Sequence, residues 1–122
     1  MTDSRVYWIE HMGERILYTD FSNATPEEIT SISKQSAAVS CAQEKKSVLQ
    51  IVDVSNVTYD LKSWQEVRNK TKEAEPYNRA SAVLGVEGVM KHFLTVTKMV
   101  SKRNIKAFDN IEDAKEWLIS QK

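Results

Sequence analysis

The feature that most constrains the fold is the stretch from 105 onward, where a short apolar segment leads directly into an amphipathic helix. Residues 105–108 are expected to form a buried strand. Asp109 or Asn110 can then accept hydrogen bonds from the free N–H groups of the first helical turn, as N-cap residues do. The apolar face that follows at helical spacing consists of Ile111, Ala114, Trp117 and Leu118. A strand joined in this way to a helix is typical of α/β domains.

Earlier segments repeat this alternation of strand and helix. Two segments rich in Val, Ile, Tyr, Trp and Phe, at 5–12 and 14–21, flank Gly13 and predict a tight hairpin. Further strands are predicted at 48–52 and 79–85, and helices at 26–44, 61–74 and 88–102. The order β-β-α-β-α-β-α-β-α implies right-handed crossovers onto a mostly parallel sheet, with the N-terminal antiparallel hairpin at its edge. We therefore expect a single α/β domain over residues 1–122.

Local signals place the helix starts and the centre of this sheet. Thr25, Pro26 and Glu28 have the spacing of a capping box with proline at the first helical position. The face of the helix that follows is rich in Ser and Ala, which would let it lie close to its neighbour. Residues 48–52 form a nearly continuous apolar run, typical of a strand covered on both faces. We expect this strand and the one at 80–84 to be central.

Composition excludes several classes of protein. Seventeen Lys and Arg balance seventeen Asp and Glu, so no field of the whole molecule would attract nucleic acid or an anionic membrane. No apolar run approaches the roughly 20 residues that span a bilayer. The first residues lack the pattern of a secretory signal, and Cys41, the one cysteine, cannot form an internal disulfide. These features favour a cytoplasmic protein with no transmembrane segment.

The chain carries no recognisable catalytic, metal or nucleotide motif. His11 and His92 have no Cys or Asp nearby at ligand spacing, so we expect no metal and no cofactor. Cys41, expected to be at least half-buried on the first helix, has no base beside it in sequence. Gly85 and Gly88 lie between a strand and a helix, where backbone N–H groups can hold an anion. Because their spacing matches no phosphate-binding motif, a turn at Gly85 is favoured over an anion site, and we expect no enzyme.

The order of elements, the segment Asp53-Val-Ser-Asn-Val57 and the segment from Lys106 to Leu118 together resemble the SpoIIAA-like branch of the STAS superfamily. STAS domains are small anti-sigma-factor-antagonist modules with a β-α superhelical sheet, and this branch is also compared with the lipid-binding CRAL-TRIO fold. The resemblance covers residues 5–120. It implies a STAS-like fold and a non-enzymatic, regulatory interaction module of a bacterial cytoplasm.

The resemblance extends to individual residues only in part. In phosphorylatable STAS domains an Asp-x-Ser-x-Val element precedes Asp-Ser-Ser-Gly at the start of a helix, where a kinase partner modifies a serine. Asp53, Ser55 and Val57 match the first element. At the second, Asp60 and Ser63 align only with a shift, and the serine doublet and the glycine are absent. A helix cap, with Asp60 at the N-cap and Ser63 at N3, is the favoured interpretation of that segment.

Two functions remain open at this point. In the first, an unidentified protein partner binds the loop and helix at 55–68, because functional loops of open α/β sheets gather at the carboxyl ends of the parallel strands. The partner-binding or regulatory residues are then Ser55, Asn56, Thr58, Tyr59, Asp60 and Ser63. In the second, the protein carries a lipid or another small apolar ligand, bordered by the Ser/Ala-rich first helix or the Met/Phe-rich third helix. Neither function requires or excludes a homodimer.

Overall fold

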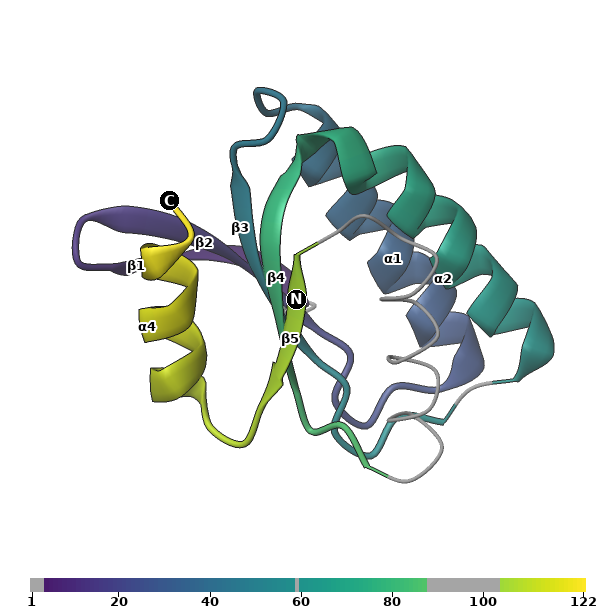
Figure 1. Ribbon diagram of the computed structural model, residues 1–122. Helices are drawn as coiled ribbons and strands as arrows, with labels where there is room; N and C mark the ends of the chain where they lie inside the picture. The colour runs from purple at the N-terminus through teal and green to yellow at the C-terminus, as the bar shows by residue number, and fades with distance from the viewer. Residues whose placement is uncertain (1–3, 59, 88–103) are drawn as a thin grey trace.

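A single mixed sheet organises the computed structural model, which describes residues 4–58, 60–87 and 104–122. The strands are β1 (Val6–His11), β2 (Glu14–Asp20), β3 (Val48–Asp53), β4 (Asn78–Leu84) and β5 (Ile105–Phe108), in the spatial order β1-β2-β3-β4-β5. The helices are α1 (Pro26–Cys41), α2 (Leu61–Ala74) and α4 (Ile111–Ser120), with a short 3-10 helix, η1 (Glu75–Tyr77), after α2. Helices α1 and α2 cover one face of the sheet and α4 lies on the other (Figure 1).

The strand directions confirm the predicted fold class. β1 and β2 are antiparallel, and β2, β3, β4 and β5 are parallel to one another. The hairpin turn consists of Met12 and Gly13, whose φ angles of 52° and 81° are both positive, as in the tight two-residue turns that match strand twist. The predicted strand at 48–52 is indeed central. The predicted helix at 88–102 lies outside the described residues.

The alternation of side chains along the strands divides the core into two layers. The layer under α1 and α2 is built from Leu17, Phe21, Ile29, Ile32 and Val48. The layer under α4 is built from Ile16, Leu49, Ile51, Ala114 and Leu118. At its edge, Phe108 and Trp117 meet with ring centroids 5.5 Å apart. The final helix is thus joined to the sheet by the apolar face that its sequence predicted.

The capping signals operate as predicted. The Glu28 N–H donates to Thr25 Oγ1 at 3.4 Å, and the Thr25 N–H donates to Glu28 Oε1 at 3.0 Å, which completes the capping box of α1. For α4 the sequence left two N-cap candidates. The structure selects Asn110, whose Oδ1 accepts from the Asp113 N–H at 2.9 Å.

A buried polar network fills the space between α1 and the sheet, and the sequence did not predict it. Gln50 Nε2 donates to Thr19 Oγ1 at 2.9 Å and to Ser36 Oγ at 3.0 Å. Asn78 Nδ2 donates to Gln50 Oε1 at 3.4 Å, and Ser81 Oγ donates to Asn78 Oδ1 at 3.2 Å. All five residues are buried. The Ser-rich face of α1 thus contacts the sheet partly through hydrogen bonds, which Ser36 makes with side chains of β2 and β3.

Cys41 differs from its expected burial. It ends α1 as an exposed residue, and its Sγ donates to the Glu73 backbone oxygen at 3.5 Å. The neighbouring Ser40 is buried. Successive helical residues point about 100° apart, so a buried Ser40 turns Cys41 toward solvent.

Candidate functional site

The loop that leaves β3 begins with a tight hydrogen-bonded turn. Asp53, the last residue of β3, accepts two hydrogen bonds at Oδ1: from the Ser55 N–H at 3.0 Å and from Ser55 Oγ at 2.7 Å. Val54 between them is buried and its N–H donates to the Leu84 backbone oxygen at 2.9 Å. Asn56 follows in the left-handed region with φ of 54°, which asparagine tolerates better than most residues. The turn therefore holds Asn56 on the surface in one orientation.

The loop that leaves β2 repeats this turn. Asp20 Oδ1 accepts from the Ser22 N–H at 2.8 Å and from Ser22 Oγ at 2.5 Å, and Asn23 has φ of 59°. The strands place Asp20 directly opposite Asp53. The two turns are also joined, because the Asn23 N–H donates to the Ser55 backbone oxygen at 2.9 Å. We call this pair, residues 20–23 and 53–56, the twin turns. Each has the sequence Asp, apolar residue, Ser, Asn, a repeat that sequence reasoning missed.

The end of β4 packs tightly against the second turn. Gly85 has φ of 76°, and a Cβ built on it would lie 2.1 Å from Ser55 Oγ and 2.8 Å from Ser55 Cα. Any larger residue would therefore displace the turn that Ser55 makes with Asp53. The positive φ supports the turn interpretation of Gly85 that the sequence favoured. Gly88, the other residue of the predicted anion site, lies outside the described residues.

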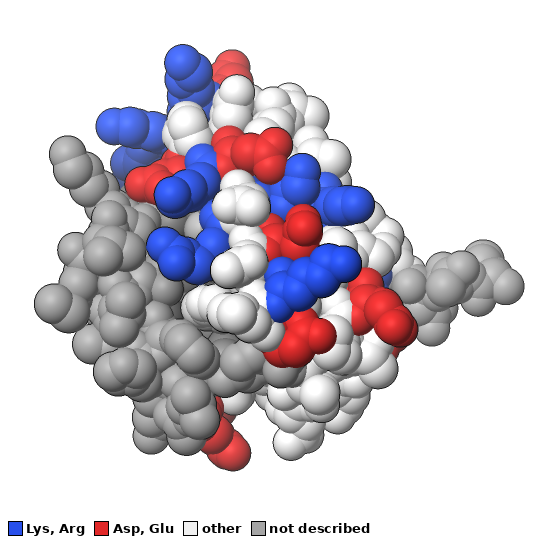
Figure 2. Space-filling model, turned by 90° about the vertical axis from the view of Figure 1, so that its right-hand side faces the viewer, with Lys and Arg blue, Asp and Glu red and all other residues white. Residues whose placement is uncertain are grey.

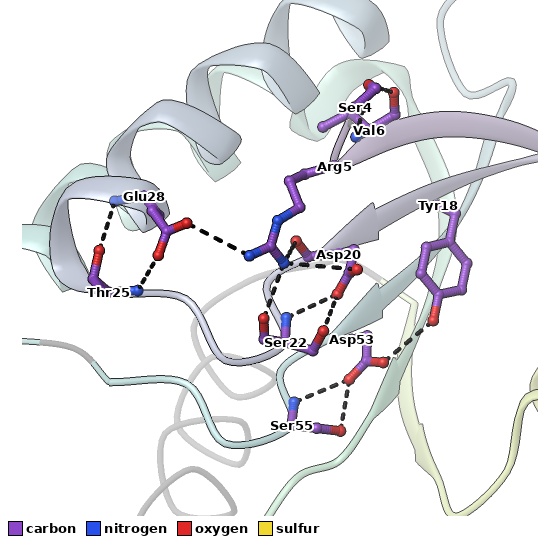
Figure 3. A network of polar contacts seen from close by, with 10 residues as sticks. All are labelled: Ser4, Arg5, Val6, Tyr18, Asp20, Ser22, Thr25, Glu28, Asp53 and Ser55. Atoms are coloured by element: carbon purple, nitrogen blue, oxygen red, sulfur yellow. Dashed lines mark hydrogen bonds and ion pairs between the residues drawn. The ribbon is translucent and has the colours of Figure 1, made fainter. Parts of the chain in front are cut away.

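Charged and aromatic side chains surround the twin turns (Figure 3). Arg5 Nη1 donates to the Ser22 backbone oxygen at 2.9 Å and lies 3.7 Å from Asp20 Oδ2, while Nη2 lies 3.6 Å from a Glu28 carboxylate oxygen. Tyr18 donates its hydroxyl to Asp53 Oδ2 at 3.3 Å. Burial, followed by the charge of Asp53, raises the pKa of Tyr18 well above its ordinary value. Tyr18 therefore stays a neutral hydrogen-bond donor to the second turn.

Two stacked tyrosines extend this region along the sheet. The rings of Tyr7 and Tyr18 have centroids 5.2 Å apart and an interplanar angle of 16°. Tyr7 is 43% exposed. Burial raises its pKa, and the nearby Asp20 and Asp53 raise it further. The phenol of Tyr7 is thus neutral and accessible on the surface.

The start of α2 forms the outer part of the site. Asp60 is the N-cap and Ser63 is N3: the Ser63 N–H donates to Asp60 Oδ1 at 2.8 Å, and the Asp60 N–H donates to Ser63 Oγ at 2.9 Å. The hydrogen bond from the Ser63 backbone is the main reason that the pKa of Asp60 is lowered. Ser63 is only 2% exposed. The favoured cap interpretation is confirmed, and the Ser63 hydroxyl belongs to the cap instead of to the exposed surface.

The structure brings several predicted partner-binding residues to one surface. Asn56, Thr58 and Asp60 are exposed and Ser55 is half-buried. The loop is fixed next to the first of the twin turns, because the Thr58 N–H donates at 3.0 Å to the backbone oxygen of Ala24, the residue that follows that turn. Tyr59 lies outside the described residues. The structure adds one residue of the predicted segment 55–68 that the sequence analysis did not name as a binding residue.

That residue is Leu61, the first residue of α2, which is 74% exposed. We call the residues of this area the loop surface: Ser55, Asn56, Thr58, Asp60 and Leu61. It combines hydrogen-bonding groups with one apolar side chain. The spacing of Leu61 with Trp64 and Val67 predicted a place on the apolar side of the helix, whereas the structure exposes its side chain to solvent.

Chemically, the site is suited to holding hydrogen-bonding groups in place. The serine hydroxyls of the twin turns donate to the carboxylates of their own turns, so both groups are engaged in holding the turn. Across the described residues, no group of three or more His, Cys, Asp or Glu could hold a metal ion. None of the described helices is long and apolar enough to cross a membrane.

The comparisons with known proteins bear on the fold. No family model and no curated protein matches the sequence. Among solved structures, the chain is similar to an uncharacterized protein of the DUF3478 family with a SpoIIAA-like fold from Shewanella loihica. The two share 12% sequence identity with a TM-score of 0.77, over 93% of this chain and 91% of the other. The protein therefore has a SpoIIAA-like fold, as its sequence resemblance implied.

Proposed function

We propose that this protein is a non-enzymatic module of the bacterial cytoplasm that binds another protein through the loop surface. The observation that carries the proposal is the 74% exposed side chain of Leu61. It stands at the N-terminus of α2, beside polar residues that the twin turns hold rigidly. A preorganised surface loses less conformational freedom on binding, so more of the contact energy contributes to affinity. Its place at the carboxyl ends of the parallel strands also supports a binding role.

The charges around this surface favour a protein over a polyanion as the partner. Figure 2 shows the side of the molecule formed by α1 and α2, where Lys and Arg are interspersed with Asp and Glu. A nucleic acid or an anionic lipid surface is bound through a continuous basic field. Charges of mixed sign near one exposed apolar side chain, Leu61, are compatible with a protein interface instead.

Ser55 gives the same surface a means of regulation. Its Oγ donates to Asp53 at 2.7 Å, and Gly85 lies against it. A negative charge introduced at Ser55 would face the Asp53 carboxylate and break the turn that orients Asn56. Modification of this serine would therefore weaken partner binding. Ser22 occupies the equivalent position in the first turn and offers a matched control.

The ligand-carrier alternative has less support from the described core. It required an apolar pocket beside the Ser/Ala-rich first helix, and the inner face of α1 instead contributes Ser36 to the buried polar network. The third helix, the other predicted border, falls in residues 88–102, beyond the described ranges. Native mass spectrometry of protein purified from its own cells tests the carrier directly, because a bound lipid would add its mass.

A matched pair of substitutions tests the binding surface. Leu61 and Met12 are exposed to almost the same extent, 74% and 73%, and Met12 lies in the hairpin turn at the other end of β2. Loss of one buried leucine from an interface costs about 1.5–3 kcal/mol, or roughly 10- to 100-fold in affinity. We expect Leu61→Lys to remove specific partners from a pull-down from native lysate, and Met12→Lys to retain them. Circular dichroism checks that both variants are folded. Equal capture by both would show that the loop surface is not the binding site.

The regulatory part is tested with Ser55→Asp against Ser22→Asp. Both introduce a carboxylate into the same kind of turn, although Arg5 lies beside the first turn and offsets part of the added charge there. Capture is therefore compared only after circular dichroism shows that both variants are folded. We expect only Ser55→Asp to reduce capture strongly. Equal capture by the two folded variants would reject Ser55 as the regulatory residue and leave the role of Leu61 to its own test.

A further inference from the structure

The outer edge of the sheet at β1 has a definite pattern of outward-facing backbone groups. The Asp20 N–H donates to the Arg5 backbone oxygen at 2.8 Å. In an antiparallel pair such residues alternate, so Arg5 and every second residue after it direct their N–H and C=O groups toward β2. Val6, Trp8 and Glu10 therefore direct theirs away from the sheet. Since β1 is the first strand in the spatial order, no strand of residues 4–58, 60–87 and 104–122 covers that side.

These outward groups differ in whether they are already engaged. Ser4 Oγ donates to the Val6 backbone oxygen at 2.6 Å and accepts from the Val6 N–H at 3.3 Å (Figure 3). Within the described part of the chain, the outward groups of Trp8 and Glu10 have no such partner. Groups of this kind are a template for pairing with another strand. β1 also lacks the proline or lysine with which edge strands are often protected.

We propose that β1 pairs with β1 of a second copy of this chain, antiparallel, about a twofold axis at which Ile9 lies opposite the partner's Ile9. In this register Trp8 and the partner's Glu10 form a hydrogen-bonded pair, and the twofold axis repeats it. Registers centred on Tyr7 or on Trp8 would use the outward groups of Val6, which Ser4 already engages. A register centred on Glu10 would set the two Glu10 carboxylates directly opposite each other, and like charges in that position are destabilising. The cap on Val6 and this repulsion together select the register centred on Ile9.

The charges of the edge agree with this register. The Arg15 guanidinium lies over the Trp8 ring, 4.1 Å from its centroid. Trp8 and Glu10 point to the same face of β1, because residues two apart do so. Within one chain Glu10 already lies opposite Arg15 on β2. In the paired sheet Glu10 also lies opposite the partner's Trp8, over which the partner's Arg15 extends, so each carboxylate lies between two guanidinium groups. The partner strand also covers part of Tyr7, which is 43% exposed in the single chain. A self-complementary pair of opposite charges is what a twofold interface requires.

Cysteine substitutions test the register. In a Cys41→Ser background, Ile9→Cys places two cysteines opposite each other in a non-hydrogen-bonded pair. Their Cα atoms are then roughly 4.5 Å apart, which lies within the range that a disulfide can bridge. Tyr7→Cys is the matched control, because position 7 lies opposite the partner's residue 11. We expect mild oxidation to link Ile9→Cys into a dimer and to leave Tyr7→Cys unlinked. Linkage of Tyr7→Cys, or of neither variant, overturns the proposed register.

Sedimentation of the whole chain over a range of concentrations tests the pairing itself. We expect a reversible species of twice the monomer mass. Glu10→Pro removes an outward N–H without disturbing the bonds to β2, as proline permits on an edge strand. It should raise the dimer dissociation constant by roughly tenfold or more. Glu10→Arg should do the same, whereas Glu44→Arg, the same charge change in a loop, should leave it unaltered. A chain that stays monomeric, or that forms open-ended assemblies, overturns the proposal.

Discussion

The contact between Gly85 and Ser55 allows a sharp test of how the twin turns are held. We consider Gly85→Ala, with Gly13→Ala as its control, because both glycines have positive φ angles, 76° and 81°. Placing alanine in that region costs about 1–2 kcal/mol in either position. At Gly13 a Cβ would have nothing within 4 Å, whereas at Gly85 it would lie 2.1 Å from Ser55 Oγ and 2.8 Å from the Ser55 backbone. The backbone of the second turn would have to move.

Displacing well-packed atoms costs a further 1–3 kcal/mol, roughly, so we expect a loss of about 2–5 kcal/mol for Gly85→Ala and about 1–2 kcal/mol for Gly13→Ala. Urea unfolding, followed by circular dichroism, measures both free energies. With a slope of about 1–3 kcal/mol per molar urea, the midpoint of Gly85→Ala should fall by more than about 1 M below wild type. If the two alanine variants unfolded at the same urea concentration, the close packing of Gly85 on Ser55 would carry no stability, and the reasoning would be refuted.

Three further perturbations test the core and the helix cap. Trp117→Ala removes the ring contact with Phe108 and should lower the unfolding free energy by about 3 kcal/mol; a variant that melts like wild type would show that α4 is peripheral. Gln50→Leu keeps the volume but leaves its buried hydrogen-bond partners unpaired, so chemical denaturation should show a loss of about 2–3 kcal/mol, and a smaller loss than for a surface control would contradict the network. Because the hydrogen bond from Ser63 lowers the pKa of Asp60, its charged form stabilises the fold above the ordinary pKa of 3.8, and this contribution is lost as pH falls through the lowered value. Asp60→Asn keeps the cap without the charge, so the unfolding free energy should fall less steeply as the pH is lowered than it does in wild type. An unchanged pH dependence at acidic pH would show that Asp60 does not contribute to it.

Most of the fold could be predicted because its signals are local. The capping box at Thr25 and the Asp60 cap each involve residues within one helical turn, and both were read correctly. The apolar run at 48–52 identified the central strand for a similar reason, since burial on both faces requires apolar residues throughout. The end of α1 was predicted less well: the helix ends at Cys41 instead of residue 44, and Cys41 is exposed although we expected it to be at least half-buried.

The candidate site depended on contacts that no local pattern contains. The repeated sequence of the twin turns is visible at residues 20–23 and 53–56, but its meaning depends on the register that sets Asp20 opposite Asp53. The role of Gly85 likewise depends on Ser55, which belongs to a different strand exit. Leu61 looked like the start of an apolar stripe, and only the direction of α2 shows that it points to solvent. All three features depend on how segments that are distant in the sequence pack together.

The buried polar network has a consequence for how the sheet chooses its pairing. Gln50 stands between Leu49 and Ile51, which face the layer under α4, while Gln50 faces α1. A slip of β3 by one residue would exchange the two faces, so the amide would enter an apolar layer and two aliphatic side chains would meet Ser36 and Thr19. An all-apolar interior would distinguish those arrangements only by shape. Here a shifted register would also leave several buried donors and acceptors without hydrogen-bond partners, each at a cost of about 1–3 kcal/mol. The network therefore specifies the register of β3: the free energy that it adds to the correct pairing is smaller than the penalty that it adds to the shifted pairings.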